Sequence, residues 1–149
     1  MNRPYIAENT RERERLSTLV SRMTDEELNL PLTEGWTIAS ALAHLAFWDQ
    51  RALVLLRKWQ KSGVTPSPSD TDTTNDALLP LCLAIAPKVA ANLAVSSAET
   101  IDRELEKASP DLIKEIEGLG DDFRLYRSKH RKLHLDEIES ALQASRRKN

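Results

Sequence analysis

The chain has 149 residues, of which 40% are apolar and 30% charged, and its formal net charge at pH 7 is -2. This size predicts a single domain, residues 1–149, with one core, and the near-neutral charge argues against nucleic acid or an anionic membrane as a partner. Four glycines and 5% aromatic residues, among many Ala, Leu, Glu, Lys and Arg, favour helices over sheets. The lone Cys82, the absence of a signal segment and the absence of an apolar run of about 20 residues lead us to expect a cytoplasmic protein that does not span a membrane.

The first half of the chain predicts two long helices and a loop. Apolar residues at mostly helical spacing predict the first helix over residues 5–29. Thr37 is a good N-cap for the second helix, which we expect to run to about residue 60, and Trp36 before it can pack back on the first turns. Residues 61–76 are polar and rich in Pro, Ser and Thr, which predicts a loop.

The second half begins with a short apolar piece and then predicts two further long helices. Pro87 favours the first turn of a third long helix, over residues 87–107. A short helix follows between Pro110 and Gly118. Asp121 or the aspartate after it caps the last helix, which we expect over residues 121–145.

Together these elements predict an all-α fold, a four-helix bundle. The first two helices are joined by only a few residues, so we expect them to be antiparallel neighbours. About 26 residues separate the second helix from the third, which is enough chain to cross the full length of the bundle. We therefore expect a long crossover between helices 2 and 3 rather than a plain up-down-up-down order.

The chain has three histidines, His44, His130 and His134, and the predicted helices direct each of them toward the bundle interior or its rim. His130 and His134 are four residues apart, so both imidazoles can reach one ion. Three neutral imidazoles from two helices would give a divalent metal three ligands and leave positions open for water or substrate. From these residues alone a packing role for the histidines stays open, because nothing in the sequence shows that the second and fourth helices are adjacent.

The spacing of the histidine pair also occurs in zinc peptidases, but the pattern differs. The segment reads HRKLH at residues 130–134 and lacks the glutamate beside the first histidine that would act as a general base. Peptidase chemistry is therefore disfavoured.

Two segments carry a resemblance to a known family. GWTIASALAHLAFWDQRA, at residues 35–52, resembles the second-helix signature of the DinB-like superfamily. HRKLHLDEIESAL, at residues 130–142, is similar to the closing helix of that superfamily, and the resemblance covers the whole chain in helix order. It implies a four-helix bundle that holds a divalent metal, nickel or zinc, through His44, His130 and His134.

The resemblance also implies a class of chemistry. The superfamily includes thiol S-transferases that use low-molecular-weight thiols such as bacillithiol, and mycothiol-dependent maleylpyruvate isomerases. We therefore expect a metal-dependent thiol S-transferase or isomerase that acts on small electrophiles with a low-molecular-weight thiol as cosubstrate. The alternative is a non-catalytic bundle that binds metal or a partner. A small-molecule substrate and a thiol are the expected partners, and a homodimer is left open.

Three further polar residues are candidates for roles around the histidines. Asp49 and Glu137 are candidate carboxylates that orient imidazoles, although Glu137 is equally well explained as a surface partner of a nearby Arg or Lys. Tyr126 lies one helical turn before His130, where a hydroxyl could donate a proton near a bound substrate. A catalytic role is the less favoured interpretation of Tyr126.

The remaining residues of interest are more simply explained by packing. Trp48 and Trp59 recur at helical spacing, which is more typical of a core or a pocket wall than of a substrate platform. Cys82 lies among Leu, Ala and Ile, so we expect an inert buried thiol rather than a nucleophile.

Overall fold

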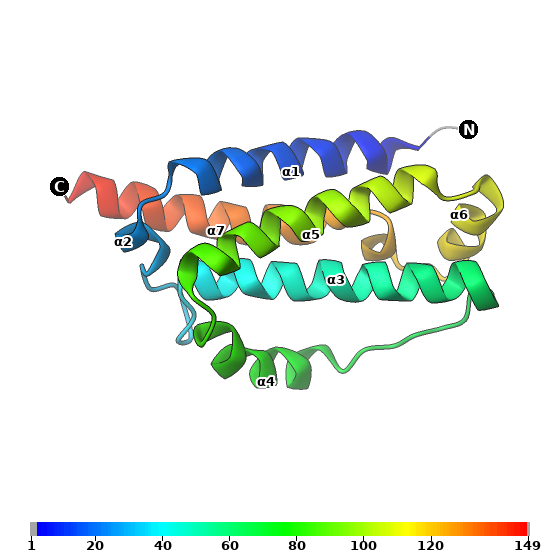
Figure 1. Cartoon of the computed structure of the whole chain (residues 1–149), viewed down its shortest axis with the longest axis horizontal. Coiled ribbons are helices and arrows are strands. Elements are labelled where there is room, and N and C mark those ends of the chain that lie inside the picture. Colours follow the sequence, from blue (N-terminus) through cyan, green and yellow to red (C-terminus); the bar gives the residue numbers. More distant parts are fainter. Residues whose placement is uncertain (1–2, 149) are drawn as a thin grey trace.

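A computed structural model describes residues 3–148, and over this range the chain is helical with no β-strand. The all-α bundle predicted from the sequence is confirmed. Four long helices form it (Figure 1): α1 (Pro4–Arg22), α3 (Ile38–Ser62), α5 (Pro87–Lys107) and α7 (Arg127–Arg147). The shorter elements are α2 (Asp25–Leu28), α4 (Thr71–Leu83), α6 (Pro110–Glu117) and a single 3-10 turn, η1 (Asp122–Arg124). Within the described range, no helix combines the length and the apolar character needed to cross a bilayer.

The long helices follow an up-down-down-up order. Figure 1 shows α3 and α5 running in the same direction, and α1 and α7 running in the opposite one. The chain between α3 and α5, which includes α4, returns along the bundle, so the predicted long crossover is confirmed. This arrangement makes α3 and α5 parallel neighbours, and they pack more extensively than any other pair of helices.

The expectation that the first two long helices are neighbours is wrong. Helix α1 packs on α5 and α7, whereas α3 packs on α5, α7 and α4, so α1 and α3 lie on opposite corners of the bundle. The connection between them is not a short turn, because it contains α2 and a bridge that pairs Pro31 with Thr37. This length of chain lets α3 begin at the far corner.

The first helix ends at Arg22, seven residues before the predicted end at residue 29. Thr24 then starts α2 through a capping box, in which the Glu27 amide donates to Thr24 Oγ1 at 3.1 Å and the Thr24 amide donates to Glu27 Oε1 at 3.0 Å. Apolar residues continue at helical spacing across the break, and Leu28 is buried. Apolar spacing alone therefore could not locate the end of α1.

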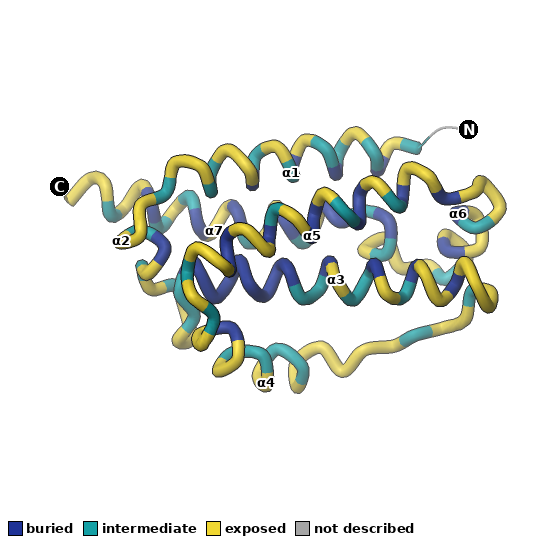
Figure 2. Tube along the Cα trace, viewed as in Figure 1, coloured by how far each residue is buried: buried dark blue, intermediate teal, exposed yellow. Residues whose placement is uncertain are grey.

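The N-terminus of α3 forms as the sequence predicts. Thr37 is the N-cap: the Ser40 amide donates to Thr37 Oγ1 at 3.1 Å, and the Thr37 amide donates to Ser40 Oγ at 2.7 Å. Every residue from 38 to 46 is buried, which Figure 2 shows as a continuous dark segment. Helix α4 lies along α3, so this half of α3 is covered by α4 as well as by α5 and α7.

Helix α4 corrects the prediction of a loop over residues 61–76, because the chain is already helical from Thr71. Its first turns are polar, and they are held by a tertiary contact in which Trp48 Nε1 donates to Asn75 Oδ1 at 2.9 Å. Pro80 lies inside the helix, where it removes one backbone donor. Composition favoured a loop, and packing against α3 determines the helix instead.

The last helix begins at Arg127 rather than at residue 121. Asp121 caps η1 instead, because its Oδ1 accepts from the Phe123 amide at 3.0 Å. The start of α7 is held from α1: Asn9 Oδ1 accepts from the Ser128 amide at 2.8 Å, and Asn9 Nδ2 donates to the Leu125 carbonyl at 2.8 Å. A buried amide from another helix therefore serves as the cap that the local sequence lacks.

The interior of the bundle has two apolar clusters. One cluster is built around Leu42, Ala94 and Leu135, and the other around Leu53 and Ile101. Between them the same four helices contribute buried polar side chains, which we call the polar layer: Asn9, Glu12, Asp49, Asp102, Arg127, Ser128 and Arg131. The candidate metal ligands border this layer, since His44 and His134 lie only a few residues from Asp49 and Arg131.

Candidate metal centre

The three histidines lie together, as the sequence predicts. His44 comes from α3, and His130 and His134 come from α7, which packs against α3. One ring nitrogen of each can be chosen so that all three nitrogens lie within 4.8 Å of one another. His44 Nε2 is 3.2 Å from His130 Nε2, and the His134 ring centroid is 4.8 Å from that of each of the other two.

This geometry fits a shared divalent ion. Nitrogens bound to one ion at about 2.0–2.1 Å lie roughly 2.8–3.0 Å apart for octahedral angles and roughly 3.3–3.4 Å apart for tetrahedral angles, a span of about 2.8–3.4 Å. The 3.2 Å between His44 Nε2 and His130 Nε2 falls in this range. An all-imidazole donor set suits zinc, nickel and other borderline divalent metals. The triad could therefore hold such an ion, and that it does so stays a prediction.

The surroundings of the triad keep its imidazoles neutral. Burial, and next the charge of His134, lowers the pKa of His44 to about 4. Burial also lowers the pKa of His130 to about 2, with the charges of His134 and Arg127 acting in the same direction. Burial lowers the pKa of His134 as well. Since only the neutral ring binds a metal, the protein presents these side chains in the ligand form at neutral pH.

The triad is accessible from one side. Its three residues line an open hollow of about 760 Å³, bounded by α4, α7 and the turn before α3, which we call the acidic hollow. Trp36 also lines the acidic hollow, and its ring centroid lies 5.3 Å from that of His44. Four carboxylates line the acidic hollow: Glu34, Asp72, Asp76 and Glu137. Such a wall favours the entry of cations and leaves room for a small molecule beside them.

The buried ring nitrogen of His44 lacks a partner. His44 Nδ1 is inaccessible to solvent and makes no hydrogen bond with any described residue. Metal-binding histidines commonly donate their second N–H to a carboxylate or a carbonyl oxygen, which fixes the tautomer. Here the Nε2 contact with His130 and the packing of Trp36 orient the ring instead.

Asp49 does not orient an imidazole, and the sequence interpretation is wrong here. Its carboxylate accepts from Arg127 Nε at 2.9 Å and from Arg131 Nη2 at 3.2 Å. The reason is the geometry of α3, which directs Asp49 into the polar layer rather than toward the triad. Glu137 does line the acidic hollow, but it forms no hydrogen bond or ion pair with the described residues.

Tyr126 is also placed away from the triad. Because α7 starts later than predicted, Tyr126 is its N-cap residue and not part of a preceding helical turn. Its ring lies 6.1 Å from that of Tyr5 on α1, at the second apolar cluster. Tyr126 is not part of the acidic hollow, so its interpretation as a proton donor there is wrong.

The packing interpretations of the other three residues are confirmed. Trp59 is buried in the second apolar cluster, and Trp48 forms a pocket wall whose ring lies 6.5 Å from that of His44. Cys82 is buried in the first cluster, and burial raises the pKa of its thiol, which makes it unreactive.

Sequence reasoning missed Arg131, the largest fully buried side chain. It donates to both oxygens of Asp102 on α5, to Asp49 on α3 and to the Asn9 carbonyl on α1. One side chain of α7 is thus bonded to the three other long helices, next to His130 in the chain. An acidic residue on an apolar face, as Asp102 is beside Ile101 and Leu105, was the available signal for a buried partner.

Comparison with known proteins gives one match. The sequence profile of a protein family, the DinB superfamily, matches residues 8–143. This range includes all three histidines and most of each long helix. No curated protein and no solved structure matches the chain.

Proposed function

The chain belongs to the DinB superfamily, and on this basis we propose that it binds a divalent metal, nickel or zinc, through His44, His130 and His134. We further propose that it is a metal-dependent thiol S-transferase or isomerase that acts on small electrophiles with a low-molecular-weight thiol. The convergence of three neutral imidazoles at the side of an open hollow carries the proposal.

The arrangement of ligands supports a reactive centre over a purely structural one. Structural zinc sites are closed by four protein ligands, whereas catalytic sites have three and keep a position open. Among the described residues no fourth His, Cys or carboxylate joins the triad. The free side faces a hollow large enough for a thiol and a small electrophile.

The chain's own residues account for the supporting steps. A divalent ion held by His44, His130 and His134 would supply Lewis acidity, the property that lowers the pKa of a thiol. The carboxylates of the acidic hollow are acceptors for the proton that such a thiol releases, and Glu137 is nearest in the chain, three residues after His134 on α7. The Trp36 ring packs edge-to-face with His44, with the ring centroids 5.3 Å apart, and also lines the acidic hollow.

Turnover measurements test the proposal. Protein purified without an affinity tag is stripped with a chelator and reloaded with nickel or zinc. Each form is assayed with monochlorobimane and a panel of thiols that includes cysteine, glutathione, coenzyme A and bacillithiol. We expect thiol-dependent turnover that requires metal and is lost in His44→Ala. Metal uptake without any thiol-dependent turnover would favour the non-catalytic alternative.

A further inference from the structure

A second hollow lies next to the acidic hollow and differs from it in charge. It has a volume of about 340 Å³, and its lining includes Arg51, Arg124 and Arg127. We call it the basic hollow. His130 lines both hollows, so the two meet at the candidate metal centre.

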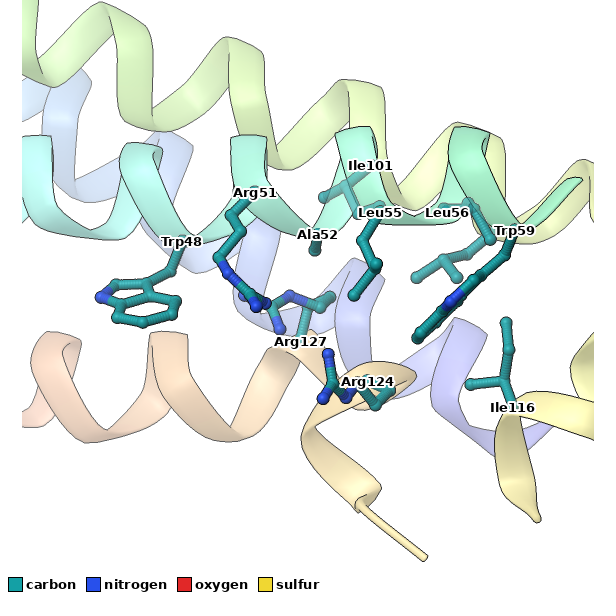
Figure 3. A pocket seen from close by; sticks show the side chains of 11 residues that line it. Trp48, Arg51, Ala52, Leu55, Leu56, Trp59, Ile101, Ile116, Arg124 and Arg127 are labelled. Carbon is teal, nitrogen blue, oxygen red and sulfur yellow. The ribbon is translucent and has the colours of Figure 1, made fainter. Parts of the chain in front are cut away.

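The same three arginines also line a narrow slot that continues into the bundle (Figure 3). In this view the Arg51, Arg124 and Arg127 side chains gather between Trp48 on one side and Trp59 on the other. Ala52, Leu55 and Leu56 provide an apolar wall for the slot. Cationic groups beside an aromatic and aliphatic wall are the surroundings that suit an anion with an apolar body.

Arg51 has bonding capacity that the protein does not use. Its bonds go from Nη2 to the Ser67 carbonyl at 3.4 Å and to the Ser67 hydroxyl at 3.3 Å, both long. Among the described residues it forms no ion pair with a carboxylate. Burial, followed by the charges of Arg124 and Arg127, lowers the pKa of Arg51, which agrees with three cations lying close together.

Arg124 also has N–H donors without an acceptor in the described part of the protein. Its Nη2 donates to the Ser67 carbonyl at 2.8 Å, and the guanidinium carbon lies 5.6 Å from the Trp59 ring centroid. Arg124 Nε is 3.3 Å from Asp121 Oδ2, but the N–H does not point at this oxygen well enough to form a hydrogen bond. The buried Nε–H has no other hydrogen-bond partner among the described residues. A guanidinium carries five N–H donors, so Arg51 and Arg124 together keep several for a ligand.

The charge balance indicates which anion fits. Asp49 is shared by Arg127 and Arg131, and Asp121 lies beside Arg124, whereas no described carboxylate forms an ion pair with Arg51. Arg51 itself offers one charge without a carboxylate partner, which a single carboxylate of a ligand matches. The planar guanidinium also matches the two oxygens of a carboxylate.

The position of Trp48 connects the basic hollow to the triad. Its ring centroid lies 5.8 Å from the Arg51 guanidinium carbon and 6.5 Å from the His44 ring centroid. Arg51 and His44 are therefore no farther apart than these two distances combined, which is the length of a small organic molecule. A ligand held by Arg51 can lie against Trp48 and still reach the candidate metal centre.

We propose that the basic hollow binds the carboxylate of a small organic acid, held by Arg51 and Arg124, with its apolar body against Trp48 and its other end directed at His130. One part of this proposal, that the bound acid is a substrate of the metal centre, rests on the proposed function. Binding of the carboxylate itself needs no metal.

The test uses benzoate as the probe and the metal-free, full-length protein. Benzoate is titrated by calorimetry, with neutral benzamide and inorganic phosphate as comparison ligands, and the indole N–H resonance of Trp48 is followed by NMR. We expect saturable benzoate binding that shifts the Trp48 resonance, and at least about tenfold weaker binding of benzamide, because charge-assisted hydrogen bonds are lost.

Variants locate the site. Arg51→Gln should weaken benzoate binding by about tenfold or more, and Arg124→Gln should also weaken it. Arg57→Gln is the matched control, because Arg57 is an exposed residue of the same helix. The Arg57→Gln variant should bind benzoate as tightly as the unaltered protein does. Circular dichroism checks that each variant is folded. Arg51→Lys keeps the charge but loses the planar fork, so it should recover only part of the affinity.

The outcomes separate this inference from the proposed function. Equal binding of benzoate and benzamide, or unchanged benzoate binding by both Arg51→Gln and Arg124→Gln, overturns the carboxylate site. Binding of phosphate without benzoate overturns the ligand class. Metal uptake by Arg51→Gln should equal that of the unaltered protein. A chain that binds benzoate through Arg51 but takes up no metal supports the carboxylate site and overturns the proposed function.

Discussion

Arg131 donates two parallel hydrogen bonds to Asp102, from Nη1 to Oδ2 at 2.9 Å and from Nη2 to Oδ1 at 2.8 Å. Both side chains are buried. Because Arg131 follows His130 directly, the pair that fixes α7 against α5 also fixes the backbone that presents a candidate ligand. Stability and ligand position are thus coupled in the polar layer.

Removing one partner of this pair should be costly. Asp102→Ala leaves the Arg131 guanidinium buried with a weaker set of acceptors, so we expect a loss of about 3–5 kcal/mol in the free energy of unfolding. Urea denaturation followed by circular dichroism measures it. Asp136→Asn, which removes an exposed carboxylate paired with Arg15 and Lys132, is the control and should cost far less. Similar losses for the two variants would contradict the importance of the buried pair.

The three histidines should behave as one unit in metal binding. Replacing His44, His130 or His134 with Ala removes a direct ligand, and each change should reduce metal affinity by more than the roughly 10- to 100-fold typical of residues that only support a ligand. Competition with a chromophoric chelator gives the affinities. Glu137→Gln is the matched control, since Glu137 lines the acidic hollow without bonding to a histidine. If His44→Ala binds metal normally, His44 has only a packing role.

Double replacements sharpen the same test. Once one ligand is lost, the remaining two no longer hold an ion in a common geometry, so a second replacement should add little. Additive losses for His44→Ala and His134→Ala would indicate separate sites.

The metal-free protein should lose stability as the pH falls below about 6.5. The folded chain holds the pKa of His44 at about 4, below the 6.5 of an unfolded chain, so the unfolded state binds more protons between these values. This difference is absent above pH 6.5 and grows as the pH drops toward 4. At pH 5, His44 alone should cost about 2 kcal/mol. The free energy of unfolding, measured in urea from pH 7.5 to 5, should fall less steeply with pH in His44→Gln than in the unaltered protein. The same pH dependence in both proteins would refute the burial of a neutral His44.

Removal of metal should leave the fold in place. None of the three histidines belongs to either apolar cluster, so chelator-treated protein should remain helical in the far ultraviolet. Added nickel or zinc should raise the stability by about 2.7 kcal/mol at a free concentration one hundred times the Kd. Thermal melts with and without metal measure the change. Loss of most helicity on chelation would show that the metal is structural.

The cap at the start of α7 should be important for stability. Asn9→Ala removes both hydrogen bonds from α1 to the first turn of α7 and leaves the Ser128 amide and the Leu125 carbonyl without these partners. We expect a loss of about 1–3 kcal/mol. Asn29→Ala, at the exposed residue that follows α2, is a suitable control, because the Asn29 side-chain amide bonds only locally, to the Asp25 carbonyl.

Features encoded by neighbouring residues were predictable from the sequence. The Thr37 cap involves residues three apart, and the face shared by His130 and His134 follows from helix geometry. The break after Arg22 was missed because the apolar spacing continues through it. Helix α4 was missed because its polar first turns are helical through packing on α3, which composition does not reveal.

Features that depend on distant pairings could not be predicted in this way. The bonds of Arg131 to Asp102 and of Arg127 to Asp49 join residues that only the up-down-down-up order brings together. The same is true of the basic hollow, whose Arg51 and Arg124 come from α3 and η1. The sequence shows such arginines only as charged residues among many, and their grouping depends on which helices are neighbours.

The long separation of the ligands has a consequence for how the protein is made. His44 and His130 lie 86 positions apart, on either side of the crossover. A ribosome that has released the chain only as far as Lys107 has exposed one of the three imidazoles, and a single imidazole is a weak site for an ion. If the triad binds a metal as proposed, the ion can be acquired only after the final helix has been synthesised and has docked beside α3. A bound ion would mark each molecule whose translation and folding have both been completed.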